Sequence, residues 1–277
     1  MFPFPFVEET AYAMTAGQVQ ISYALLALAH IPTMVISLSF AIWLYWHTKK
    51  LSSFYLLLIT IAFSLWTYFD YCAWTSGPRS IMFSWSVLDL FATFFTILTY
   101  WFFYSFIKEQ DVPTWQKLVS ACFIIPPVVY ELSSFNMTEF LNTQSLALEN
   151  QYTRYYVPGI GVVFLCAVIA LAVIEYRKTT DTIAKQKILW STLATGLFLS
   201  IFLLPILLSN LVLFLNIGLA QYAYNFIVYS LFSMPFLTGI LAYLIVKYQA
   251  FNIKVIKSIV YILICMAILF VNIFLPY

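Results

Sequence analysis

Long runs of apolar residues constrain this chain more than any other feature of its sequence. Eight such runs cover residues 18–46, 51–74, 81–107, 115–132, 156–176, 187–211, 219–246 and 257–275. Each is close to or above the roughly 20 residues that an α-helix needs to cross the hydrocarbon core of a bilayer. Outer-membrane barrels instead show segments of about ten residues with alternating hydrophobicity. The runs therefore predict helices that satisfy their own backbone hydrogen bonds.

The composition points to the same class. Apolar residues make up 63% of the 277 residues and charged residues 9%, whereas a soluble globular domain has about 25% charged residues. We expect an all-α integral membrane protein, with a seven-transmembrane helix bundle over residues 1–253 and an additional transmembrane helix over residues 254–277. The alternative is a helix that lies along the inner leaflet. A crossing helix here is expected to begin a hairpin that leads to an absent output domain, as in a truncated or split longer protein.

The distribution of Lys and Arg predicts the orientation, because short cytoplasmic loops retain these residues. Numbering the sides alternately from the N-terminus puts 11 of them on one side and only 2, Arg79 and Arg154, on the other. The N-terminus is therefore expected outside, and the loop after the seventh run is expected in the cytoplasm. The predicted location is the inner (plasma) membrane, with several passes.

Three ionisable residues fall inside apolar runs, where they are costly and usually face the interior of the bundle. His30 lies near the middle of the first run, and Asp70 near the outer end of the second. Asp89 lies about nine residues into the third run, roughly 13 Å deep. A histidine with one or two carboxylates can form a proton-sensitive pair or bind a cationic ligand. The alternative is a structural role in joining helices or beside the Pro32 kink.

Other features of the runs carry weaker expectations. Asn210, Gln221 and Asn225 are neutral polar residues where the sixth and seventh runs meet outside, able to bind a ligand or, alternatively, to cap helix ends. Trp66 is expected as an interfacial anchor at the outer end of the second run. The prolines at positions 126 and 127 are expected to kink or break the fourth helix. The connection 131–156 is expected to be a lid or a flexible surface.

The seventh run leaves the bilayer through a basic and aromatic junction, GILAYLIVKYQAFNIKVIK at residues 239–257. Aromatic side chains at the interface and lysines on anionic headgroups fix the depth of such a helix. The junction is either a plain interfacial anchor or a connector that carries a signal out of the membrane. Its candidate residues are Tyr243, Lys247, Tyr248, Phe251, Asn252 and Lys254.

The ending AYLIVKYQAFNIKVIKSIVYILI resembles the close of the N-terminal seven-transmembrane region of bacterial sensor histidine kinases. The family pattern A-Y-x-I-x-x-Y-x-x-F-D-I is matched by Ala242, Tyr243, Ile245, Tyr248, Phe251 and Ile253, with Asn252 where the family commonly has Asp. The segment from Trp66 to Asp70 is similar to the family's second helix. The resemblance implies an outside N-terminus, an extracellular or intramembrane signal and a cytoplasmic output. The chain contains no phosphoacceptor helix and no ATP-binding domain, so kinase activity is not implied.

Motifs of several enzyme classes are absent from the sequence. It has no HExxH, no GxSxG and no phosphate-binding glycine loop, and the interior of the seventh run has no lysine for a retinal Schiff base. We expect a non-enzymatic sensory or receptor module in signal transduction, with no cofactor and no metal. The alternatives are a small transporter or permease subunit and a structural membrane protein.

The expected partners follow from that prediction. They are membrane lipids, a small-molecule or membrane-borne signal, and a cytoplasmic signalling partner or kinase domain. Nucleic acid is not expected as a partner, and a homodimer is left open.

Overall fold

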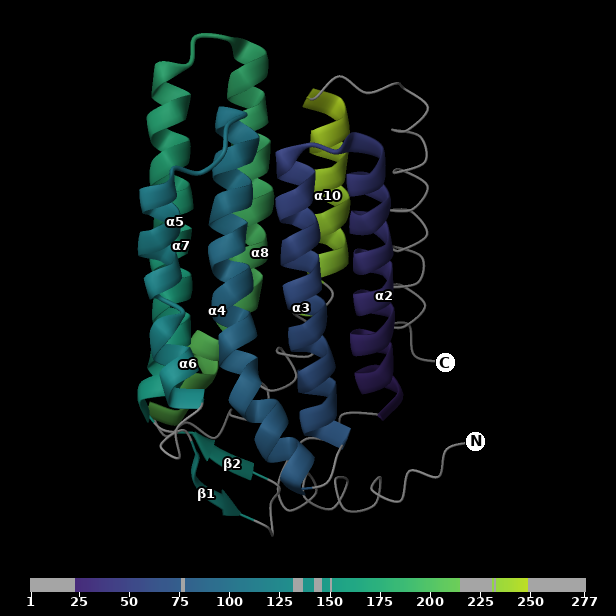
Figure 1. Cartoon of the computed structure of the whole chain (residues 1–277), viewed down its shortest axis with the longest axis vertical. Coiled ribbons are helices and arrows are strands. Elements are labelled where there is room, and N and C mark those ends of the chain that lie inside the picture. Colours follow the sequence, from purple (N-terminus) through teal and green to yellow (C-terminus); the bar gives the residue numbers. More distant parts are fainter. Residues whose placement is uncertain are drawn as a thin grey trace.

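The computed structural model describes residues 23–75, 78–131, 137–141, 146–149, 151–214, 231 and 233–248. In these ranges the chain forms a bundle of long helices: α2 (Tyr23–Thr48), α3 (Leu51–Thr75), α4 (Pro78–Lys108), α7 (Gln151–Lys178), α8 (Thr182–Phe214) and α10 (Ser233–Tyr248) (Figure 1). Shorter elements lie beside them: α5 (Thr114–Cys122), α6 (Ile125–Glu131), β1 (Met137–Leu141) and β2 (Leu146–Glu149). The additional helix predicted over residues 254–277 lies outside the described residues.

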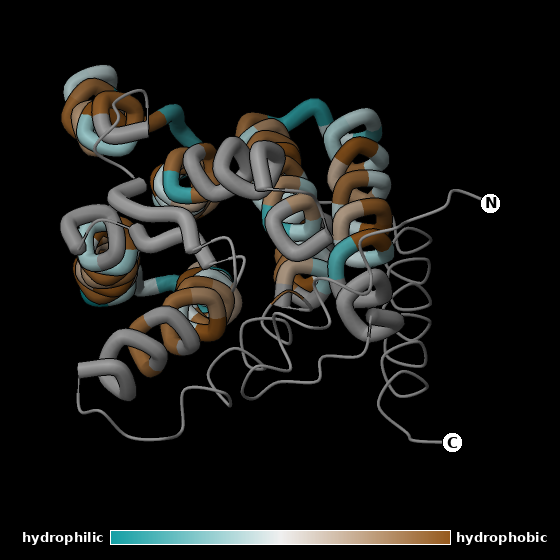
Figure 2. The backbone as a smooth tube through the Cα atoms, turned by 90° about the horizontal axis from the view of Figure 1, so that it is seen from below, coloured by the Kyte–Doolittle hydropathy of each residue, from teal (hydrophilic) through white to brown (hydrophobic). Residues whose placement is uncertain are grey.

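The helices have the length and surface of membrane-spanning segments. Four stretches are long and apolar enough to cross a bilayer: Leu51–Cys72, Val87–Lys108, Tyr155–Lys178 and Thr182–Leu204. Hydrophobic residues run along the helices, and hydrophilic ones concentrate near the connections (Figure 2). Side chains that face outward on these helices, such as Val163, Leu197 and Leu204, are large and apolar. The prediction of a helical membrane protein is therefore confirmed, and the count of seven spans stays a prediction.

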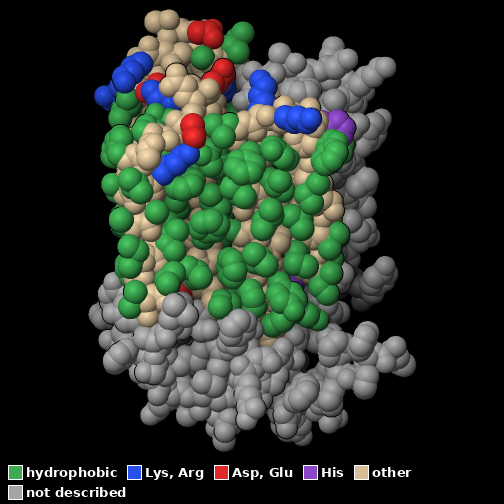
Figure 3. All heavy atoms as spheres, viewed as in Figure 1, with side chains coloured by type: hydrophobic (Ala, Val, Ile, Leu, Met, Phe, Trp, Pro, Cys, Tyr) green, Lys and Arg blue, Asp and Glu red, His purple; other side chains and the backbone are tan. Residues whose placement is uncertain are grey.

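Lys, Arg, Asp and Glu side chains gather at one end of the bundle, above a broad hydrophobic belt (Figure 3). We call this end, which carries the connections 49–50, 109–113 and 179–181, the basic end. The opposite end, next to β1 and β2, is called the hairpin end (Figure 1).

Helix α4 lies at the centre of the packing. It contacts α3, α7 and α8, while α10 packs against α2 and α8 and closes the bundle. The Phe95 ring of α4 lies 5.6 Å from that of Phe63 on α3 and 4.8 Å from that of Phe202 on α8. Because these three rings are fully or almost fully buried, aromatic packing holds the middle of the bundle together.

Trp66 belongs to this aromatic core. Its ring is edge-on to Phe202 at 5.1 Å, and the residue is only 7% exposed. The expectation that Trp66 is an interfacial anchor is therefore wrong, because this face of α3 is covered by α4 and α8. Tyr68, two residues further on, points away from the core and is 51% exposed.

The fourth apolar run is broken into α5 and α6. Phe123 and Ile124 form a turn, with their amides bonded to Ser120 O and Ala121 O. Pro126 and Pro127 lack the N–H groups that would continue the ladder of α5, yet they fit the first turn of a new helix. The predicted effect of the two prolines is thus confirmed as a break rather than a kink.

The connection between α6 and α7 contains an antiparallel pair of strands, β1 and β2. Their register pairs Glu139 with Leu148, Phe140 with Ala147, and Leu141 with Leu146. The sequence indicated only a lid or a flexible surface here, because the two segments are short and show no clear alternation of polar and apolar residues. The pairing gives the hairpin end a small ordered element that packs near α4.

Helix α8 begins at the basic end with a side-chain cap. Both carboxylate oxygens of Asp181 accept backbone hydrogen bonds, from Ile183 N at 3.2 Å and from Ala184 N at 3.0 Å. These bonds satisfy two of the amides that have no partner within the helix. The cap explains why α8 begins at Thr182, five residues before the apolar run predicted from the sequence.

Replacing Asp181 with alanine is expected to lower the free energy of unfolding by about 1 kcal/mol, because the two capped amides lose their acceptor. Asp181→Asn keeps an acceptor oxygen at the same position and serves as the control. Denaturation of purified protein in bicelles measures both variants. Equal losses in the two would show that the negative charge of Asp181, rather than its acceptor geometry, supports the start of α8.

Candidate functional site

A buried, hydrogen-bonded His–Asp pair joins α2 to α3. His30 Nε2 lies 2.9 Å from Asp70 Oδ2, and the two side chains are 1% and 7% exposed. His30 comes two residues before Pro32 in α2, and Asp70 lies in the last third of α3. Since the two helices are antiparallel neighbours, residues 40 positions apart in the sequence meet nearer the hairpin end. The structure thus brings together two of the three ionisable residues singled out in the apolar runs.

The surroundings of the pair are aromatic. The Tyr71 ring lies against the His30 ring, with centroids 5.6 Å apart and planes tilted by 51°. Asp89 is placed on α4, where its side chain is partly exposed. A buried charge is strongly attracted to its partner, and the cost of losing that partner is high.

Buried hydroxyl groups form a second feature of the interior. Six have no hydrogen-bond partner within the part of the chain that the structure describes: Thr33, Ser37, Ser64, Thr67, Thr93 and Thr195. Thr33 and Ser37 follow His30 by three and seven residues, which places all three on one face of α2. Ser64 and Thr67 precede Asp70 on α3. The pair therefore lies at one end of a group of buried polar side chains.

The remaining predicted site residues fall in different places. Asn210 lies on α8 without a described side chain, and Tyr248 is the last residue of α10. Lys247 is exposed at the basic end, with its Nζ atom 5.6 Å from the centre of the partly buried Tyr243 ring. Outside the described residues lie Gln221, Asn225, Phe251, Asn252 and Lys254.

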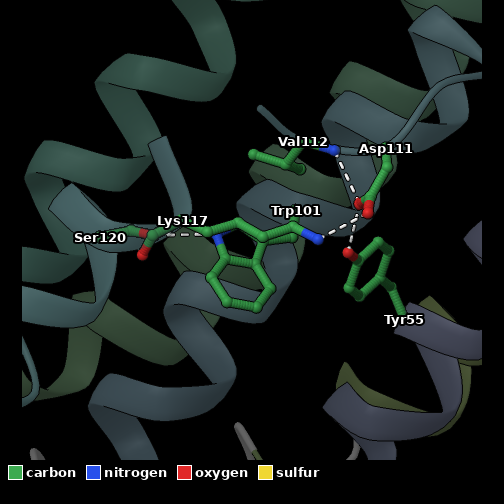
Figure 4. A network of polar contacts seen from close by, with 6 residues as sticks. All are labelled: Tyr55, Trp101, Asp111, Val112, Lys117 and Ser120. Carbon is green, nitrogen blue, oxygen red and sulfur yellow. Dashed lines mark hydrogen bonds and ion pairs between the residues drawn. The ribbon is translucent and has the colours of Figure 1, made fainter. Parts of the chain in front are cut away.

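A polar network closes the basic end between α3, α4 and α5 (Figure 4). Asp111 accepts hydrogen bonds from Tyr55 Oη at 2.6 Å, Lys117 Nζ at 2.6 Å and the Val112 amide at 2.8 Å. Trp101 Nε1 donates to Ser120 Oγ at 2.9 Å, and the Lys117 ammonium lies 5.7 Å from the centre of the Trp101 ring. This arrangement, which we call the Asp111 clasp, ties the connection after α4 to the first turns of α3.

Two further ion pairs bind the end of α4 to α7 and α8. Lys108 Nζ donates to Glu175 Oε1 at 2.6 Å, and Lys187 Nζ donates to Glu109 Oε1 at 2.6 Å. Glu109, the residue that follows α4, has a left-handed backbone conformation (φ 56°). The Lys187 side chain is 10% exposed and also lies over the Phe106 ring, so this lysine depends on Glu109 for a counter-charge.

Sequence reasoning missed the acidic half of these contacts. In the sequence, the lysines indicate a side of the membrane, but they do not indicate which acids they contact. A signal was present, because Glu109, Asp111 and Glu175 fall on the same predicted side as most of the lysines. The pairing itself joins residues 67 and 78 positions apart, which a single sequence does not reveal.

The carboxylates of this end have shifted pKa values. The hydrogen bond and charge of Lys187 lower the pKa of Glu109 below its ordinary value of 4.5. Burial acts to raise the pKa of Asp111, but hydrogen bonds from Lys117, Tyr55 and the Val112 amide outweigh it and lower that pKa below 3.8. Both groups therefore stabilise the fold above their ordinary pKa values, and that stability is lost as the pH falls through the lowered values.

The melting temperature of the wild type is expected to exceed that of Glu109→Gln by a constant amount at pH values above 4.5, the ordinary pKa of this carboxyl. The difference is expected to shrink at lower pH, because protonation of Glu109 removes the same charge as the substitution. Thermal unfolding followed by tryptophan fluorescence measures it. A difference that does not vary with pH would contradict the ion pair with Lys187.

The described residues contain no group of three or more His, Cys, Asp or Glu side chains able to hold a metal ion. Comparison with known proteins gives no match to any family model, curated protein or solved structure.

Proposed function

We propose that this chain is the membrane-spanning sensory module of a signalling system. The observation that carries the proposal is the buried hydrogen bond between His30 and Asp70, which joins two helices inside an apolar bundle. Ionisable side chains within membrane helices are costly, and they most often mark sites of proton or ligand chemistry.

In this proposal the chain crosses the plasma membrane of a bacterial cell seven times, with its N-terminus outside. The excess of Lys and Arg on one side supports this orientation. The basic end then faces the cytoplasm, and the His30–Asp70 pair lies in the outer half of the membrane. The junction at residues 239–257 acts as the output connector, in keeping with its resemblance to the sensory region of histidine kinases.

Helix α3 links the two ends of the proposed device. Asp70 and Tyr55 are 15 residues apart on this helix, or about 22 Å. Tyr55 donates to Asp111 in the clasp at the basic end. When the His30–Asp70 contact breaks, α3 moves against α2. This movement changes the geometry of the Asp111 clasp. A signal shifts the protein between two packings of its helices only if it binds the two packings with different affinities.

The proton is the simplest signal that this pair can bind. Only the imidazolium form of His30 makes a full charge pair with the carboxylate of Asp70. Tyr71 faces the imidazole from α3. Helix α10 also packs against α2, and its described titratable side chains, Tyr243 and Lys247, lie near the basic end. Protonation of His30 therefore changes the net charge of the pair.

Distance measurements between spin labels test the proposal. Gln110→Cys and Thr180→Cys place labels on two exposed connections of the basic end, after replacement of Cys72, Cys122, Cys166 and Cys265 by serine. The full chain is reconstituted in liposomes, and the external pH is changed from about 8 to about 5. We expect the distance distribution between the labels to shift, because the clasp holds one labelled connection against α3.

His30→Asn is the matched control, since asparagine can still donate a hydrogen bond to Asp70 but cannot become a cation. Its distance distribution is expected to stay the same across the pH range. An unchanged distribution in the parent protein, or an equal shift in His30→Asn, contradicts the sensory role of the pair. Net proton uptake by the same liposomes would instead support the alternative of a small transporter.

A further inference from the structure

Two side-chain contacts fix how α2 and α3 face each other. His30 contacts Asp70 near the hairpin end, and the Thr48 hydroxyl donates to Ser53 at the basic end. Because the helices are antiparallel, each step along α2 toward the basic end is matched by an equal step back along α3. The two contacts are 18 residues apart on α2 and 17 residues apart on α3, so the levels between them can be assigned to within one residue.

Hydroxyl groups occupy the two levels next to the pair. Thr33 is level with Thr67, and Ser37 is level with Ser64. All four are at least nine-tenths buried, at 1%, 0%, 0% and 6% exposure in the order named. None of the four has a hydrogen-bond partner within the described residues. We call these four residues the hydroxyl seam. It extends about 10 Å from His30 toward the basic end.

An apolar layer closes the seam on the side of the basic end. Ala41 is level with Thr60, whose hydroxyl donates to Leu56 O at 2.8 Å. One turn further, Leu44 is level with Leu56, and these side chains are 1% and 0% exposed. The interface between α2 and α3 is thus polar from the His30–Asp70 pair to Ser37 and Ser64, and it is apolar at Leu44 and Leu56.

Several buried hydroxyls elsewhere in this bundle are hydrogen-bonded, unlike those of the seam, although Thr93 on α4 and Thr195 on α8 also have no partner within the described residues. A Ser or Thr in a membrane helix ordinarily donates to the carbonyl four residues earlier. Thr96 and Thr99 on α4 and Thr238 on α10 do so, at 2.7 to 2.8 Å. A buried hydroxyl left without a partner costs about 1 to 3 kcal/mol. Four such groups at consecutive levels, beside a carboxylate, therefore call for a bound polar ligand.

We propose that the hydroxyl seam binds a short file of water molecules that reaches the Asp70 carboxylate. A hydroxyl group both donates and accepts, and a buried water molecule makes two to four hydrogen bonds, so water satisfies all four groups without bringing in a charge. The file also solvates the buried pair from within the bundle. This inference concerns hydration alone and does not depend on the sensory role of the pair.

Water-edited solid-state NMR on threonine-labelled protein in lipid bilayers tests the proposal. The signals of Thr33 and Thr67 are expected to gain intensity from water several-fold faster than those of Thr96 and Thr99. These two controls are equally buried threonines whose hydroxyls are satisfied by their own helix. Sequential backbone assignment of the wild type identifies the two seam signals. Equal rates for the seam and control threonines overturn the proposal.

Stability gives a second and independent readout. If water satisfies the seam, Thr33→Val and Thr67→Val are expected to lower the melting temperature, because an isosteric methyl group removes a water partner. In a dry seam the same variants would raise the melting temperature, since they remove an unsatisfied polar group. That rise would overturn the proposal. The NMR measurement does not use the variants in its main comparison, so it stands even where a variant fails to fold.

Discussion

Replacing His30 with leucine is expected to lower the free energy of unfolding by about 3 to 5 kcal/mol. The substitution leaves the Asp70 carboxylate buried without the imidazole that it contacts at 2.9 Å. Removing one partner of a buried ion pair has a cost of this size because an uncompensated charge remains in an apolar interior. Denaturation of the purified protein in bicelles measures the loss, with the native α-helical signal as the readout.

The double variant His30→Leu/Asp70→Leu separates the cost of an unpaired charge from the loss of packing. It is expected to be more stable than His30→Leu alone, because apolar side chains of similar volume replace buried ion pairs at little cost. A double variant that is less stable than the single one would show that Asp70 stabilises the bundle through partners other than His30.

The second large effect is expected at Gly161, where α7 contacts Leu203 of α8. A methyl group added at Gly161 would overlap the Leu203 Cδ2 atom and lie 2.9 Å from Leu203 Cδ1. Leu203 is 3% exposed, so its side chain has little room to move away. Gly161→Ala is therefore expected to lower the free energy of unfolding by about 1 to 3 kcal/mol.

Gly159, two residues earlier on α7, is the matched control. A methyl group there has no atom within 4 Å. Gly159→Ala gains the same helix propensity as Gly161→Ala, up to about 1 kcal/mol. The difference between the two variants therefore isolates the overlap with Leu203. Equal stability of the two would mean that α7 and α8 adjust their spacing at no cost.

Helix positions could be predicted because membrane helices require long apolar runs. The runs at 51–74, 81–107 and 156–176 each fall within a helix of the structure, α3, α4 and α7. Helix ends were less predictable, since they depend on single capping groups such as Asp181. The break between α5 and α6 could be anticipated from Pro126 and Pro127, because proline acts through local backbone chemistry.

The residues of the candidate site also differ in how far they could be predicted from the sequence. His30 and Asp70 stood out from the sequence because ionisable residues are rare within apolar runs, and their expected proximity followed from the adjacent antiparallel helices. The Asp111 clasp did not stand out, because charged residues at helix ends are ordinary. Its tyrosine comes from another helix, 56 residues earlier in the chain. Such contacts depend on how helices rotate and pack, which one sequence does not specify.

The apolar layer of Leu44 and Leu56 also has an electrical consequence. It lies 14 residues from His30 along α2, or about 21 Å. If the proposed water file opens to the outer solution, most of the transmembrane voltage falls across the poorly polarisable layer rather than across the seam. Moving one charge through 100 mV amounts to about 2.3 kcal/mol, but a proton exchanging between the seam and His30 crosses little of that drop. The pair would then respond to proton concentration with little dependence on membrane potential.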